Sequence, residues 1–208
     1  MQKPKNFWDS FEGRYQMGEQ KHRMYLLNLL KDKGVKTLLD DGCGTAPIYE
    51  IIKDHPDLGF EYKGTDYSEG MIEICKREFP EGNFEVQDAR KLTEKDNSWD
   101  CVLLMHALDH LDDYQSAISE AARVASKYVC IVLWRGFIAE GTNLNDRNMM
   151  NKNEGEEPWE DTHLQEYSRD TLQTEFKKNK LKVVHTATGE TINSDASKYN
   201  FLFLLKKL

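Results

Sequence analysis

Leu38-Leu39-Asp40-Asp41-Gly42-Cys43-Gly44-Thr45-Ala46 is the segment from which the fold of this 208-residue chain follows. An apolar run that ends in acids and then meets glycines is typical of the first strand of an alternating α/β chain. Gly42 permits a tight turn, and Gly44 lets the backbone approach a ligand without an intervening Cβ. Pro47 suits the first position of a helix, where no N–H partner is needed. The segment therefore predicts a strand, a glycine turn and a helix, with a ligand at the carboxyl end of the strand.

The same alternation of strand and helix continues along the chain. Apolar residues recur at helical spacing in residues 25–30, before this segment, and a series of short apolar runs follows it. Uninterrupted apolar runs suit strands that are buried on both faces of a parallel sheet. Asp112, with Gln115 at the third helical position, and Ser168 are expected to cap helices. We predict strands over residues 35–41, 60–65, 84–87, 101–105, 129–134, 181–186 and 199–205, and helices over 48–52, 68–78, 114–125 and 168–178.

The last two predicted strands are joined only by residues 189–197, which are too few for a crossover helix, so these strands should pair antiparallel. We expect an α/β fold, a Rossmann-like three-layer sandwich with a mostly parallel seven-stranded sheet and an antiparallel C-terminal strand. The length favours a single domain over residues 1–208. Residues 1–34 would form an N-terminal helical cap, and the polar, acidic residues 136–167 would form a lid or substrate insertion.

The composition of the chain disfavours several classes of binding partner. A net charge of −8 repels a phosphate backbone and disfavours a nucleic-acid partner. No apolar run reaches the roughly 20 residues of a membrane span, and the first residues do not resemble a signal peptide, so we expect a cytoplasmic protein. The spacing of the four cysteines predicts free thiols and no metal site. The oligomeric state is left open.

Asp66 is the second chemical signal, because it ends the second predicted strand 24 residues after Gly42. An acid at this distance can accept hydrogen bonds from both hydroxyls of a ribose, as in other nucleoside-binding α/β folds. The alternative is that Asp66 only caps the helix that begins near Ser68.

With these two elements the chain resembles the class I S-adenosylmethionine-dependent methyltransferases of the small-molecule type. Asp40-x-Gly42-x-Gly44-x-Ala46 is similar to that family's acid-x-Gly-x-Gly-x-Gly, with alanine in place of the third glycine. The resemblance implies S-adenosylmethionine as cofactor and transfer of its methyl group to oxygen or nitrogen of a small-molecule acceptor. A third glycine is also missing for the rival dinucleotide motif Gly-x-Gly-x-x-Gly, because position 47 is proline.

The resemblance also implies which residues surround the cofactor. The glycine loop would wrap its methionine part, Asp40 would orient its amino group, Asp66 would bind its ribose, and Asp88 would meet its adenine amino group. The implied cofactor-binding residues are Tyr15, Asp40, Gly42, Gly44, Thr45, Ala46, Asp66, Tyr67, Met71, Asp88, Ala89, Met105 and His106.

Methyl transfer from a sulfonium is an in-line displacement in which alignment of donor and acceptor supplies much of the rate, so no protein nucleophile is needed. A hydroxyl or protonated amine acceptor would be helped by a general base, for which histidine is the usual residue. His106, His110 and His163 are the candidates, and each has the alternative of a packing role. Acidic residues between 154 and 161 motivate the hypothesis of a cationic acceptor, although such runs are usually solvated surface.

Other methyltransferase classes fit less well. Enzymes that methylate the amino groups of bases resemble one another in an Asn/Asp-Pro-Pro-Tyr/Phe run after the fourth strand, whereas this chain has Met-His-Ala-Leu at 105–108. Cys101 lies at the wrong end of that strand to act as the nucleophile of a cytosine-C5 enzyme. Two alternatives stay open: a protein that binds S-adenosylmethionine without catalysis, and a methyltransferase acting on protein or RNA through residues 136–167.

Overall fold

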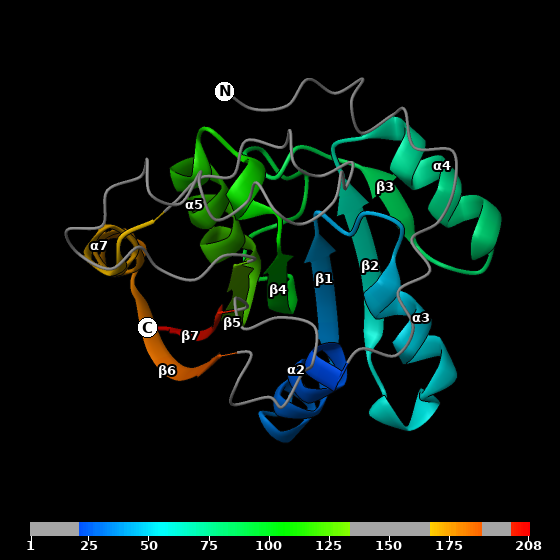
Figure 1. Cartoon of the computed structure of the whole chain (residues 1–208), viewed down its shortest axis with the longest axis horizontal. Helices are drawn as coiled ribbons and strands as arrows, with labels where there is room; N and C mark the ends of the chain where they lie inside the picture. The colour runs from blue at the N-terminus through cyan, green and yellow to red at the C-terminus, as the bar shows by residue number, and fades with distance from the viewer. Residues whose placement is uncertain (1–20, 134–166, 189–200) are drawn as a thin grey trace, which may run out of the picture.

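A computed structural model of the chain describes residues 21–133, 167–188 and 201–208. In these residues a seven-stranded sheet has the order β3-β2-β1-β4-β5-β7-β6 (Figure 1). The strands β1 to β5 pair in parallel, whereas β7 pairs antiparallel with both β5 and β6. The predicted sheet and its antiparallel C-terminal strand are therefore confirmed. The strands are β1 (Thr37–Asp41), β2 (Glu61–Asp66), β3 (Phe84–Val86), β4 (Trp99–Met105), β5 (Ala125–Leu133), β6 (Leu181–Thr188) and β7 (Phe201–Lys207).

Helices cover both faces of the sheet and complete a three-layer sandwich. One apolar core joins the sheet to the helices α2 (Lys21–Asp32), α3 (Pro47–Asp54) and α4 (Glu69–Glu78). A second core joins the opposite face to α5 (Tyr114–Val124) and α7 (Arg169–Lys178). Along β4, Leu103 enters the first core and its neighbours Val102 and Leu104 enter the second, as alternation along a strand requires. In Figure 1 the central strands lie between α3 and α4 at the right and α5 and α7 at the left.

Most predicted helix starts agree with the structure. Pro47 is the first residue of α3, and Ser68 and Ser168 cap α4 and α7 by accepting backbone hydrogen bonds. The predicted cap at Asp112 is wrong by one residue. Asp113 caps α5, because its carboxylate accepts hydrogen bonds from both the backbone N–H and the hydroxyl of Ser116, at 3.1 and 2.6 Å.

Strand β5 begins earlier than predicted, at Ala125 rather than at residue 129. Ser126 and Lys127 are exposed, so the start of this strand carries no apolar run, although Ala125 already pairs with Trp99 of β4. The strand follows α5 directly, without a loop.

Several predictions concern residues that lie wholly or partly outside the described ranges. The helical cap is described only from residue 21, and of residues 136–167 only Tyr167 lies within the described residues. The division of the chain into cap, domain and lid therefore stays a prediction. The four cysteines are buried free thiols, as predicted. Within the described ranges, no helix is both long and apolar enough to cross a membrane.

Candidate functional site

The glycine loop after β1 is tied to the end of β2 by its backbone. The N–H groups of Gly42 and Cys43 both donate to the carbonyl oxygen of Thr65, at 2.8 and 2.9 Å. The N–H of Gly44 donates to Oδ2 of Asp66 at 2.9 Å, and the thiol of Cys75 on α4 donates to the carbonyl oxygen of Gly44 at 3.1 Å. The loop and the ribose-type acid identified in the sequence thus lie in direct contact.

The two glycines of the loop have different roles. Both have positive φ angles, +84° at Gly42 and +55° at Gly44. A Cβ on Gly42 would lie 2.6 Å from the Cβ of Ala107, whereas a Cβ on Gly44 would meet no atom of the described residues within 4 Å. Gly42 therefore allows the loop after β4 to pack closely, and Gly44 leaves room for a ligand beside the backbone.

Ala46 stands where the resembling motif has its third glycine. It is fully buried and adopts the left-handed conformation that glycine favours, with φ +61°, immediately before α3. The loop path is therefore kept in this chain at the cost of a strained alanine. Thr45, beside it, is also buried.

Asp66 holds two loops at once. Its Oδ1 accepts the N–H of Ser68 at 2.9 Å, while its Oδ2 accepts the N–H of Gly44. The cap of α4 is Ser68, whose hydroxyl accepts the N–H of Met71 at 3.1 Å. Asp66 is half-buried, and each carboxylate oxygen has more than one lone pair, so it can still accept bonds from a ligand.

At the end of β3 the structure adds a residue that sequence reasoning missed, Arg90. Its guanidinium binds both carboxylate oxygens of Asp88, at 2.8 and 2.6 Å, and lies 5.9 Å from the centre of the Tyr67 ring. These hydrogen bonds hold the pKa of Asp88 below its usual range. Tyr67, Asp88 and Arg90 therefore lie together at the predicted adenine position, near half-buried Ala89. The Asp-x-Arg spacing was the only signal in the sequence for Arg90.

Two acids at the end of β1 are buried. Asp40 accepts a hydrogen bond from the Tyr62 hydroxyl at 2.7 Å, and burial raises the pKa of Asp40 to about 7. Asp41 accepts one from the Thr65 hydroxyl at 3.0 Å, and burial raises the pKa of Asp41 to about 8. The second carboxylate oxygen of Asp41 has no partner among the described residues.

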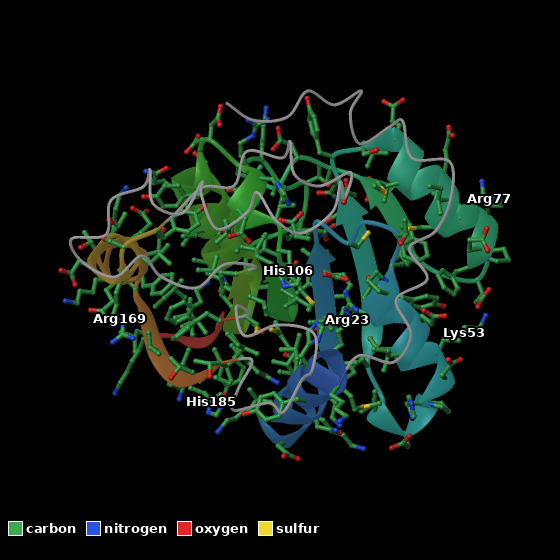
Figure 2. The ribbon with its side chains drawn as sticks, viewed as in Figure 1. Arg23, Lys53, Arg77, His106, Arg169 and His185 are labelled. Atoms are coloured by element: carbon green, nitrogen blue, oxygen red, sulfur yellow. The ribbon has the colours of Figure 1, made fainter. Side chains whose placement is uncertain are left out.

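The first turn of α2 contributes two buried polar residues that the sequence analysis did not identify, because it interpreted that helix from its apolar residues. Arg23 is attracted to Asp40 and Glu50, and although burial lowers its pKa to about 10 it stays charged at neutral pH. His22 lies against His106, with 6.4 Å between the ring centres. Figure 2 labels Arg23 and His106 near the centre of the molecule.

Two of the three histidines predicted as general bases, His106 and His110, lie in the loop after β4. His106 has φ +58°, a rare conformation for a residue with a side chain, and its N–H donates to the carbonyl oxygen of Val132 at 2.8 Å. His110 ends the short helix η2 (Leu108–His110). The Tyr167 hydroxyl donates to the carbonyl oxygen of Leu108 at 2.6 Å and so fixes this loop to the start of α7.

The remaining predicted site residues are placed as follows. Met71 and Met105 are buried, at the start of α4 and the end of β4. Tyr15 and His163 lie outside the described residues. No group of three or more metal-ligating side chains occurs in the part of the chain that the structure describes.

Comparison with known proteins finds similarity to methyltransferases. The family model of the methyltransferase domain matches residues 39–132. A ubiquinone/menaquinone biosynthesis C-methyltransferase of Desulfotalea psychrophila is 30% identical over 138 residues, which are 60% of this chain and 55% of that protein. A demethylmenaquinone methyltransferase of Staphylococcus haemolyticus is 32% identical over 111 residues, 50% of this chain and 46% of that one. The chain thus spans about half the length of the curated relatives it matches.

Solved structures agree in fold. The magnesium protoporphyrin IX methyltransferase from Synechocystis, with bound S-adenosylhomocysteine, has a TM-score of 0.67 and 16% identity, and the match covers 98% of this chain and 93% of that one. The geranyl diphosphate C-methyltransferase from Streptomyces coelicolor has a TM-score of 0.70 and 12% identity, with 98% and 96% covered.

Gly42→Ala is expected to destabilise the protein by about 3 kcal/mol, because the new Cβ meets Ala107 and the φ angle is unfavourable. Gly34→Ala is the matched control: its φ is +73°, but nothing in the described part of the chain lies within 4 Å of the added Cβ, so it should cost only about 1 kcal/mol. Urea unfolding of both variants measures the difference. Equal losses would contradict the close contact with Ala107.

Asp41→Asn is expected to stabilise the protein increasingly as the pH rises from about 4 to about 8. The folded state holds the Asp41 proton over this range and the unfolded state does not, so wild-type stability falls through it. The variant does not titrate there, and its advantage should grow by about 5 kcal/mol across this pH range, because each pH unit contributes about 1.4 kcal/mol. Melting temperatures across this pH range provide the measurement, with exposed Asp57→Asn as control. A pH-independent difference in melting temperature between Asp41→Asn and wild type would contradict the raised pKa of Asp41.

Proposed function

We propose that this chain, whose residues 39–132 match the methyltransferase-domain family model, is a class I S-adenosylmethionine-dependent methyltransferase that binds its cofactor at the carboxyl ends of β1 and β2 and methylates a small-molecule acceptor. The observation that carries the proposal is the contact between the glycine loop and Asp66, beside the space at Gly44. Similarity to this family alone leaves the acceptor open, since one fold hosts many chemistries.

The described residues fit this cofactor. Gly44 leaves an open space that a side chain would fill, and Asp66 stands beside it with accepting capacity for ribose hydroxyls. Tyr67 is partly exposed next to Asp88 and Arg90, and offers a ring face for the adenine. Arg23 and the buried carboxyl of Asp40 lie close enough at the end of β1 to influence each other's charge, and the zwitterionic methionine part would bind there.

When bound, S-adenosylmethionine supplies a methyl group that its sulfonium already activates. The chain therefore has to orient the acceptor, exclude water and accommodate the proton of a protic acceptor. Among the histidine candidates we propose His106 as the general base, because it directly follows β4, and its backbone N–H is bonded to Val132. His110 and His163 remain predictions, as does closure of the site by Tyr15 and residues 136–167.

For the acceptor, the names of the relatives favour a small molecule. Two are named for steps on quinones, and the structural neighbours are named for magnesium protoporphyrin IX and geranyl diphosphate. We propose a small-molecule acceptor methylated on oxygen or nitrogen, and the names of the C-methyltransferase relatives add carbon as an alternative. The charge of −8 is consistent with an acceptor other than nucleic acid.

Thermal unfolding with S-adenosylmethionine, S-adenosylhomocysteine and NAD tests the proposal. A ligand at 100 times its dissociation constant adds about 2.7 kcal/mol, or roughly 5–10 °C for a chain of this length. We expect this shift with the two sulfur nucleosides only. A shift with NAD alone would overturn the proposal, and binding without release of S-adenosylhomocysteine for any acceptor would favour a non-catalytic protein.

Gly44→Ala is expected to abolish this shift while lowering the melting temperature of the free protein by only a few degrees. The added Cβ fills the space beside the loop but meets no atom of residues 21–133, 167–188 and 201–208. Gly34→Ala, which also places alanine at a positive φ angle but lies before β1 rather than after it, should keep the full shift. Gly44→Ala is more informative than Asp66→Ala, which would also release the Gly44 and Ser68 N–H groups. An undiminished shift in Gly44→Ala would place the ligand elsewhere.

A further inference from the structure

His22 is a buried imidazole with an unexplained pair of polar atoms. It lies in the first turn of α2 and is 5% exposed. Neither ring nitrogen has a hydrogen-bond partner among the described residues. Buried side-chain nitrogens in folded proteins nearly always have a partner, so two such atoms on one ring need an explanation.

The position of His22 suggests where a partner would come from. Its ring faces that of His106, which follows β4, at 6.4 Å and with 35° between the ring planes. The next residue, Arg23, is attracted to Asp40 at the end of β1. His22 therefore lies at the edge of the sheet where β1 and β4 end, which is the edge that carries the glycine loop.

A purely structural residue at this position would be better served by an apolar side chain. Leu26, Leu27 and Leu30 on the same helix are fully buried in the core and supply its packing. An imidazole instead loses its hydration and gains no hydrogen bond from the residues that the structure describes. Such a group is typical of a site where a ligand completes the hydrogen bonding.

The surroundings of His22 select the charge of that ligand. Burial, and then the neighbouring charge of Arg23, lower the pKa of His22 to about 4, so the ring is neutral at pH 7. The charged or titratable groups that face it are Arg23 on α2 and His106 after β4. What disfavours an imidazolium here also disfavours an ammonium group of an acceptor. A neutral imidazole offers one acceptor nitrogen and one donor nitrogen.

We propose that His22 contacts the methyl acceptor, and that its imidazole accepts a hydrogen bond from a neutral hydroxyl group of that acceptor beside His106. This inference rests on the proposed function and narrows it to acceptors that carry an uncharged hydroxyl. It argues against the cationic acceptor suggested by the acidic residues between 154 and 161.

Side-chain nitrogen NMR of the histidines tests the contact directly. The wild-type protein, saturated with S-adenosylhomocysteine, is titrated with phenol, with anisole, which lacks the donor proton, and with benzylammonium. We expect phenol to move the His22 ring-nitrogen signals, and the other two probes to leave them in place. The signals are assigned by their loss in His22→Phe. Unchanged His22 signals with phenol, or an equal response to anisole, would overturn the inference.

Substitution of His22 gives a second readout, through thermal unfolding and methyl transfer. His22→Phe keeps the ring shape and removes both unpartnered nitrogens, so the melting temperature of the free protein should rise by roughly 3 °C. Its shift with S-adenosylhomocysteine should be unchanged, whereas methyl transfer should fall at least 50-fold and recover in part in His22→Asn. His185→Phe is the matched control, because His185 also contacts α2 but is already bonded to the Tyr25 hydroxyl at 2.8 Å. It should lower the melting temperature and spare the phenol response.

These outcomes distinguish a failure of the proposed function from a failure of the role proposed for His22. If S-adenosylhomocysteine produces no thermal shift in the wild-type protein, the proposed function fails and this inference fails with it. If the shift is present but His22→Phe retains full methyl transfer, only the role of His22 is wrong.

Discussion

The carboxylate of Asp66 is the interaction on which the site depends, because it joins the loops that follow two neighbouring strands. It can do so only through the register of the sheet. Parallel pairing sets Asp40 beside Gly64 and Asp41 beside Thr65, so the residues just beyond β1 arrive at the end of β2. The loop conformation, the start of α4 and the space at Gly44 are therefore one unit.

The sequence predicted the features that local pattern determines. Apolar runs located the strands, and the spacing from Gly42 to Asp66 located the contact between loop and acid. The start of β5 was missed because its first exposed residues carry no apolar signal, and the α5 cap because two adjacent aspartates compete for one position. His22, Arg23 and Arg90 were missed for another reason: a polar residue becomes a site residue through tertiary burial and charge pairing, which leave no periodic mark in the sequence.

The site edge of the sheet also differs in character from the cores beneath it. The cores are packed with leucine, isoleucine, valine and alanine, whereas Asp40, Asp41, His22 and Arg23 are buried at or beside the end of β1. Burial opposes the charged form of each of these side chains. A fold that gathers costly polar groups at one edge gives up stability there, which is a common property of functional sites.

The place of β7 between β5 and β6 has a consequence for biosynthesis. A ribosome makes β5 and β6 before residues 201–207, so the outer edge of β5 stays without its neighbour while some 70 further residues are added, a matter of several seconds. That edge belongs to a fully apolar strand end, Val129–Leu133, whose unpaired backbone is a template for association with other nascent chains. The strand order of this sheet therefore makes the pairing of its central apolar strand wait for the last residues of β7.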